Sequence, residues 1–107
     1  TYTDRHSNGG DMTMLFATKY PHLINKAISM DHRRMIMPRT EKPRLYTLRG
    51  CDYDADAGVL PTKQEQEQFH MKVVKLDGIT HSNMGENGTE EQHRLINQSI
   101  YGFLTQE

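Results

Sequence analysis

The stretch His6-Ser7-Asn8-Gly9-Gly10 is followed by the largely apolar run Met12-Thr13-Met14-Leu15-Phe16-Ala17. A serine before two glycines, with an apolar segment beyond them, predicts a sharp turn from a strand into a helix. Such a turn can hold a serine hydroxyl clear of the backbone, where it can act as a nucleophile. Ser7 is therefore the first candidate for a reactive group.

Signals for strands and helices alternate along the rest of the chain. Two capping boxes, Thr62 to Glu65 and Thr89 to Gln92, mark helix starts, and two prolines within 32–43 argue against a full helix there. This alternation predicts one α/β domain over residues 1–107, with a partial parallel sheet of about three to four strands and flanking helices. The predicted strands are 1–5, 27–30, 44–49 and 72–76, and the predicted helices are 11–19, 62–70 and 89–104.

Composition narrows the class of protein. The 107 residues are 35% apolar and carry a net charge of −1 with both signs interspersed, which gives no electrostatic case for binding nucleic acid or an anionic membrane. No apolar run approaches the roughly 18 residues of a membrane helix, and residues 1–5 lack the apolar segment of a signal peptide. A single cysteine, Cys51, fits a reducing compartment. We therefore expect a cytoplasmic protein.

Three loops at the predicted carboxyl ends of strands contain side chains that can react. These are the Ser7 turn, the acidic turn 50–58 and the loop around His81. Reactive groups of parallel sheets gather at that edge. A serine needs a neutral imidazole to take its proton, and the imidazole needs a carboxylate to fix its tautomer. The chain supplies these groups in the order Ser, Asp, His.

This order and the local motifs resemble the α/β-hydrolase superfamily. His6-Ser7-Asn8-Gly9-Gly10 looks like its nucleophile elbow, and Ala27-Ile28-Ser29-Met30-Asp31 resembles the strand that follows. Residues 45–61 resemble the strand and turn that carry the acid, and residues 76–81 the strand and loop that carry the histidine. The resemblance spans nearly all of the chain but only the C-terminal half of the family's fold.

The resemblance implies a role for each candidate residue. Ser7 would be the nucleophile, His81 the general base, and the backbone N–H of Asn8 an oxyanion donor. Asp52 is the preferred acid because it lies two residues after Gly50, close to where the family places its acid, and Asp56, five residues before Pro61, is the alternative. The implied function is a serine hydrolase acting on a small ester-like substrate, without a cofactor. No metal is expected either, because the neighbouring Asp31-His32 lacks the spacing of metal ligands.

Two departures from the family define the alternative. Arg5 stands where the family's elbow has its first glycine, and the family's N-terminal strands have no counterpart here. A sheet cut at its middle would leave one edge unpaired, so we expect self-association or pairing with an N-terminal half. The isolated chain would be inactive or nearly so. The alternative function is a catalytically inactive remnant that serves as an interaction module.

Overall fold

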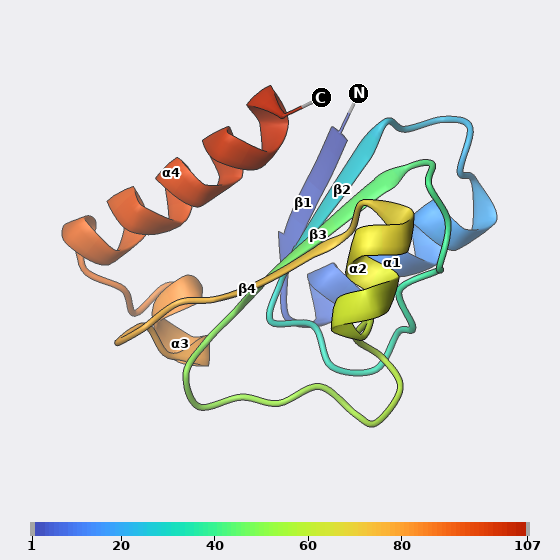
Figure 1. The fold of residues 1–107 in the computed structure, drawn as a ribbon. Helices are drawn as coiled ribbons and strands as arrows, with labels where there is room; N and C mark the ends of the chain where they lie inside the picture. The colour runs from blue at the N-terminus through green and yellow to red at the C-terminus, as the bar shows by residue number, and fades with distance from the viewer. Residues whose placement is uncertain (1, 107) are drawn as a thin grey trace.

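A four-stranded parallel sheet lies at the centre of the molecule (Figure 1). The computed structural model describes residues 2–106, with the side chains of residues 6–106. Strand order follows the sequence, and the registers align Arg5, Ser29, Thr47 and Val73 across the sheet. The predicted α/β class and the small parallel sheet are confirmed. The strands are β1 (Tyr2–His6), β2 (Lys26–Met30), β3 (Arg44–Arg49) and β4 (Lys72–Lys75).

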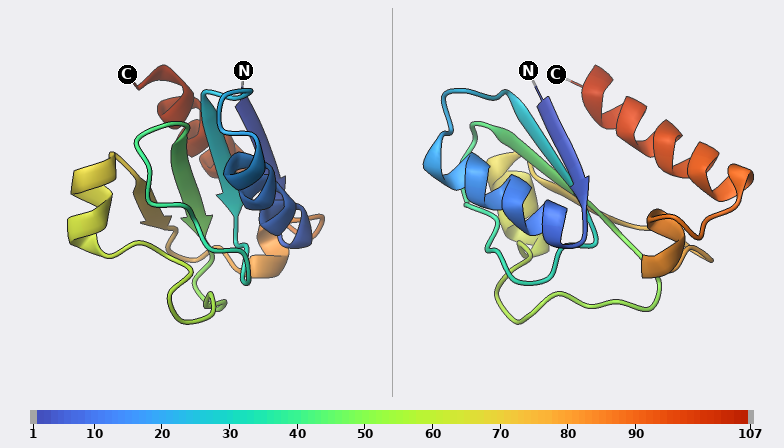
Figure 2. Two further views of the ribbon diagram at one scale, coloured as in Figure 1. Left: turned by 90° about the vertical axis from the view of Figure 1, so that its right-hand side faces the viewer. Right: turned by 180° about the vertical axis from the view of Figure 1, so that it is seen from behind.

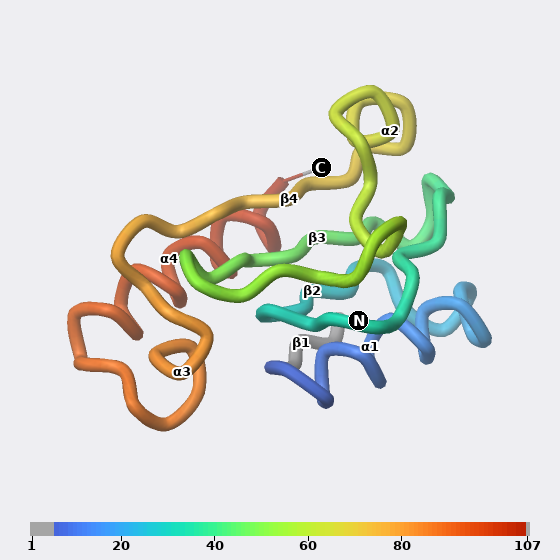
Figure 3. Tube along the Cα trace, turned by 90° about the horizontal axis from the view of Figure 1, so that it is seen from below, coloured from blue at the N-terminus to red at the C-terminus, as the bar shows by residue number. Residues whose placement is uncertain are grey.

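Helices cover both faces of the sheet, so the fold has three layers (Figures 2 and 3). One face carries α1 (Asn8–Lys19) and α2 (Lys63–Phe69), and the other carries α3 (His81–Met84) and α4 (Glu90–Thr105). Each face has its own apolar core. The core under α1 and α2 contains Met14, Ala17, Ile24, Ala27, Met37, Leu45 and Met71. The core under α3 and α4 contains Ile28, Tyr46, Leu48, Ile79, Met84, Ile96 and Phe103.

The helix boundaries follow from local capping. Both predicted capping boxes form, at Thr62 before α2 and at Thr89 before α4. A third box, in which Thr80 pairs with Asn83, starts the short helix α3 over residues predicted to be a loop. That difference arises because the Thr80 hydroxyl and the Asn83 amide satisfy the amides that one helical turn leaves open.

The segment 32–43 between β2 and β3 contains no helix, as its prolines predicted. Arg39 stabilises this irregular segment, because its guanidinium donates hydrogen bonds to the backbone carbonyls of Met37, Val59 and Leu60. In the described part of the chain, no helix combines the length and apolar character needed to cross a membrane.

Candidate functional site

Ser7 occupies a strained turn between β1 and α1. Its φ is 57° and its ψ is −120°, a conformation that costs a non-glycine residue roughly 1–3 kcal/mol. The turn is held from both sides, since the Ser7 N–H donates to the Met30 carbonyl at 2.8 Å and the Ser7 carbonyl accepts from the Asp11 N–H at 3.0 Å. The predicted sharp strand-to-helix turn is confirmed, and Ser7 is half-buried.

His81 begins α3, and its imidazole is hydrogen-bonded to Asp31. Asp31 Oδ2 lies 3.0 Å from His81 Nδ1. Because a carboxylate only accepts, Nδ1 carries the hydrogen, and Nε2 is then the basic nitrogen of the neutral ring. Asp31 directly follows β2, has a φ of 59° and is fully buried. Its other oxygen, Oδ1, accepts from the Gly50 N–H at 2.8 Å.

Among the described residues, the hydrogen bonds of the two expected acids do not involve the His81 ring. Asp52 was preferred, but its carboxylate accepts from the backbone N–H of His81, at 2.8 Å, and not from the ring. The alternative, Asp56, forms a half-exposed ion pair with Arg33 at 3.0 Å. Asp31 reaches the ring because its left-handed backbone turns the side chain across the end of β3, next to a glycine.

Two aromatic rings enclose the His81 imidazole. Tyr53 is stacked on it, with ring centroids 3.7 Å apart and planes 19° from parallel, and the centroid of the His6 ring is 4.7 Å away. His6 Nε2 donates to the His81 carbonyl at 2.9 Å, and burial lowers the pKa of His6. His6 is therefore a neutral packing partner of the His81 ring.

The residue before Ser7 thus lies against His81, while Ser7 itself makes no hydrogen bond with His81 among the described residues. Hydrogen bonds between nucleophile and base are often long before a substrate binds. Asn8 is the first residue of α1. Its backbone N–H is one of the helix amides that lack an intrahelical acceptor.

A series of buried polar side chains connects Asp31 to His32. Arg49 is 4% exposed, lies 3.6 Å from Asp31 through its Nε and donates through Nη1 to Thr47 at 3.2 Å. Thr47 in turn accepts from Ser29, whose hydroxyl is hydrogen-bonded to Nδ1 of His32. Arg49 places a compensating positive charge beside the buried Asp31 carboxylate.

His32 should make folding stability depend on pH. Burial first, and the nearby Arg49 charge second, lower the pKa of His32 from 6.5 to about 4. The unfolded chain therefore binds more protons between these values, so the free energy of unfolding falls as pH drops from about 6.5 to about 4. The full loss is about 3 kcal/mol. Urea unfolding across this range should show it, with a flatter curve for His32→Gln.

His22→Gln is the matched control for that measurement, because His22 is exposed on the loop after α1. It should retain the slope of the wild type. If His32→Gln also retained the slope, other groups would account for the pH dependence.

The remaining candidates have ordinary surroundings. His22 and His70 are exposed, and His93 is half-buried. No group of three or more His, Cys, Asp or Glu side chains in the described residues could hold a metal ion. The side chain of Arg5, which departs from the family's glycine, lies outside those that the structure describes. The sequence feature that could have pointed to Asp31 is its position directly after the buried strand β2. Ser7 has the same position after β1.

No family model, curated protein or solved structure matches this chain.

Proposed function

We propose that the chain carries the reacting groups of a serine hydrolase of the α/β-hydrolase type, with Ser7 as nucleophile, His81 as general base and Asp31 as the acid. The observation that carries the proposal is the Asp31–His81 hydrogen bond, 3.0 Å long, at the sheet edge where β1 ends in the strained Ser7 turn. The substrate class is a small ester, because an ester carbonyl is open to attack by a serine hydroxyl activated by imidazole.

The proposed reaction has two halves. Ser7 Oγ attacks the acyl carbon and passes its proton to His81 Nε2, and the alkoxide leaving group then takes that proton. A water molecule repeats the sequence, releasing a carboxylic acid and restoring the Ser7 hydroxyl. Throughout, Asp31 holds Nδ1–H and stabilises the imidazolium that forms.

The developing oxyanion also needs a donor. The Asn8 N–H meets this need because it lies at the amino end of α1, where the amides are unpaired and the helix dipole favours negative charge. One such donor contributes on the order of 10²–10³ in rate.

An active-site serine probe tests the proposal directly. Labelling needs a single attack by Ser7 and not repeated turnover, so a chain with almost no hydrolytic activity can still react slowly. We expect a fluorophosphonate to label the wild-type chain slowly at Ser7, located by mass spectrometry of the digested protein, and we expect Ser7→Ala to abolish labelling. Ser82→Ala is the matched control, since Ser82 is exposed next to His81, and it should label like the wild type. An unlabelled wild-type chain, or labelling at Ser82, would contradict the proposed function.

A second candidate is a partner-binding module, and the sheet edge favours it. Within the described residues β1 pairs with β2 alone, so its outer backbone groups are open to another strand. Next to it, α1 exposes Met12 and Phe16 four residues apart, and the Phe16 ring packs against the exposed Tyr20. A folded wild-type chain that resists the probe would favour this module over the hydrolase.

A further inference from the structure

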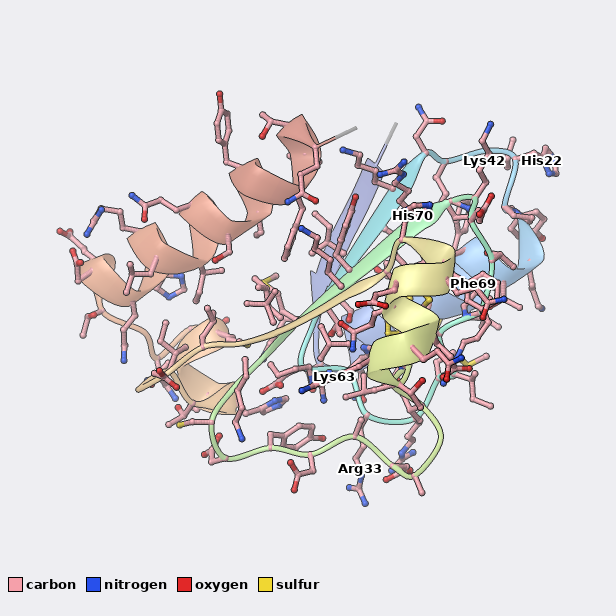
Figure 4. All side chains as sticks on the ribbon, in the orientation of Figure 1. His22, Arg33, Lys42, Lys63, Phe69 and His70 are labelled. Atoms are coloured by element: carbon pink, nitrogen blue, oxygen red, sulfur yellow. The ribbon has the colours of Figure 1, made fainter. Side chains whose placement is uncertain are left out.

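Two adjoining hollows lie along α2 and the amino ends of β2, β3 and β4, away from His81. One, of about 670 Å³, runs beside α2 from Lys63 to His70. The other, of about 750 Å³, continues from His70 to Lys42 and His22. Arg44, His70 and Gln106 line both. The two hollows therefore form one continuous groove, which we call the amino-edge groove. Figure 4 labels Lys63 and His70 toward the two ends of α2, with Lys42 and His22 beyond His70.

The amino-edge groove is strongly cationic in a chain whose net charge is −1. Five lysines and arginines line it, against the two glutamates Glu41 and Glu67. The ion pairs found among the described residues involve neither Lys42, Lys63 nor Lys72. These three ammonium groups are exposed. Their positive charge therefore faces the solvent of the groove without a carboxylate bound to it.

The carboxyl end of α4 does not cancel this charge. Its last carbonyls would present the negative end of the helix to the groove. Lys26 covers them, because its ammonium donates to the carbonyls of Phe103 at 2.7 Å and Leu104 at 3.1 Å, and also to that of Gln106. Lys26 thus neutralises the helix end, and Lys42, Lys63 and Lys72 remain available to a ligand.

We propose that the amino-edge groove binds a soluble ligand carrying two or more phosphate groups. Lysine is a point-charge binder of phosphate, and the lysines are spread along a groove that extends from Lys63 to His22, which calls for more than one anionic group. The rings lining the groove are those of His22 and His70. It therefore offers no large aromatic platform for stacking a base, which favours a phosphate chain over a nucleotide.

Isothermal titration with inorganic tripolyphosphate at low ionic strength tests this proposal. We expect the wild-type chain to bind and the double variant Lys63→Gln/Lys72→Gln to bind at least tenfold more weakly. The matched control is Lys19→Gln/Lys75→Gln, which removes the same charge from exposed positions on α1 and β4 outside the groove. It should change the dissociation constant by less than about twofold. None of these lysines belongs to the Ser7 site, so the result is independent of the proposed hydrolase.

Three results would overturn the proposal. The first is no binding by the wild-type chain. The second is an equal loss in both double variants, which would mean attraction to net charge rather than to the groove. The third is capture by vesicles containing a phosphoinositide without any binding of free tripolyphosphate, which would assign the lysines to a membrane surface instead.

Discussion

Asp31→Asn should slow fluorophosphonate labelling of Ser7 by about 10³–10⁴-fold. The Asp31 carboxylate accepts the Nδ1 hydrogen of His81 at 3.0 Å, and this contact keeps Nε2 free to take a proton from the serine. An asparagine in its place can offer an N–H to the ring and favour the wrong tautomer, and it cannot balance the imidazolium. Loss of the equivalent carboxylate in a well-studied serine protease costs about 10⁴ in rate. The measurement is the pseudo-first-order rate of probe incorporation.

The variant must be separated from simple unfolding. Asp31 is fully buried beside Arg49, and removing one member of a buried ion pair costs roughly 3–5 kcal/mol because the other charge remains unpaired. The double variant Asp31→Asn/Arg49→Gln removes both charges and should regain a folded circular dichroism spectrum. Its labelling should stay slow. Recovery of fast labelling in the double variant would mean that Asp31 acts on stability alone.

Asp52→Asn supplies the matched comparison. Its side-chain oxygen can still accept the His81 backbone N–H that Asp52 now holds at 2.8 Å, so labelling should change by less than about threefold. The sequence predicted the opposite order of effects. A larger loss for Asp52→Asn than for Asp31→Asn would restore Asp52 as the acid.

The fold was predictable because local signals and global topology agree. The strand-forming run 44–49, the prolines of 38–43 and the two capping boxes each act over a few residues, and each appears in the structure as expected. The turn at Ser7 was predictable for the same reason, since a serine before two glycines and an apolar run is a local pattern. The position of His81 beyond the last strand was predictable from the order of the elements.

The acid that we propose, Asp31, could not be predicted in that way. Asp31, Asp52 and Asp56 all lie on loops beyond strand ends, so position along the chain does not separate them. What separates them is three-dimensional, namely the left-handed backbone of Asp31 and the space that Gly50 leaves beside it. In the sequence, Asp31 is distinguished only by its position at the end of the strand stretch 27–31 and by its neighbour His32. Neither the backbone angle nor the contact across 50 residues has a signature in a single sequence.

Gly50→Ala should lower the free energy of unfolding by about 3 kcal/mol, at the upper end of the cost of overpacking. A Cβ on Gly50 would lie 2.6 Å from Asp31 Oδ2, 2.8 Å from the His81 nitrogen and 2.9 Å from the Thr80 carbonyl carbon. The last two are backbone atoms, which cannot rotate away. Relief therefore requires moving the start of α3, and with it the His81 ring, so probe labelling should also slow.

Gly102→Ala should have the opposite sign. Gly102 lies within α4, and a Cβ there meets nothing within 4 Å. Alanine is preferred over glycine in a helix by roughly 0.8–1 kcal/mol, so this variant should be more stable than the wild type and should label at the same rate. Urea unfolding of both variants provides the measurement. A free energy of unfolding for Gly50→Ala within about 0.5 kcal/mol of the wild-type value would be on the order of a neutral surface change. That result would show that the backbone after β3 can shift to accommodate a methyl group. Gly50 would then not be required for the Asp31–His81 contact.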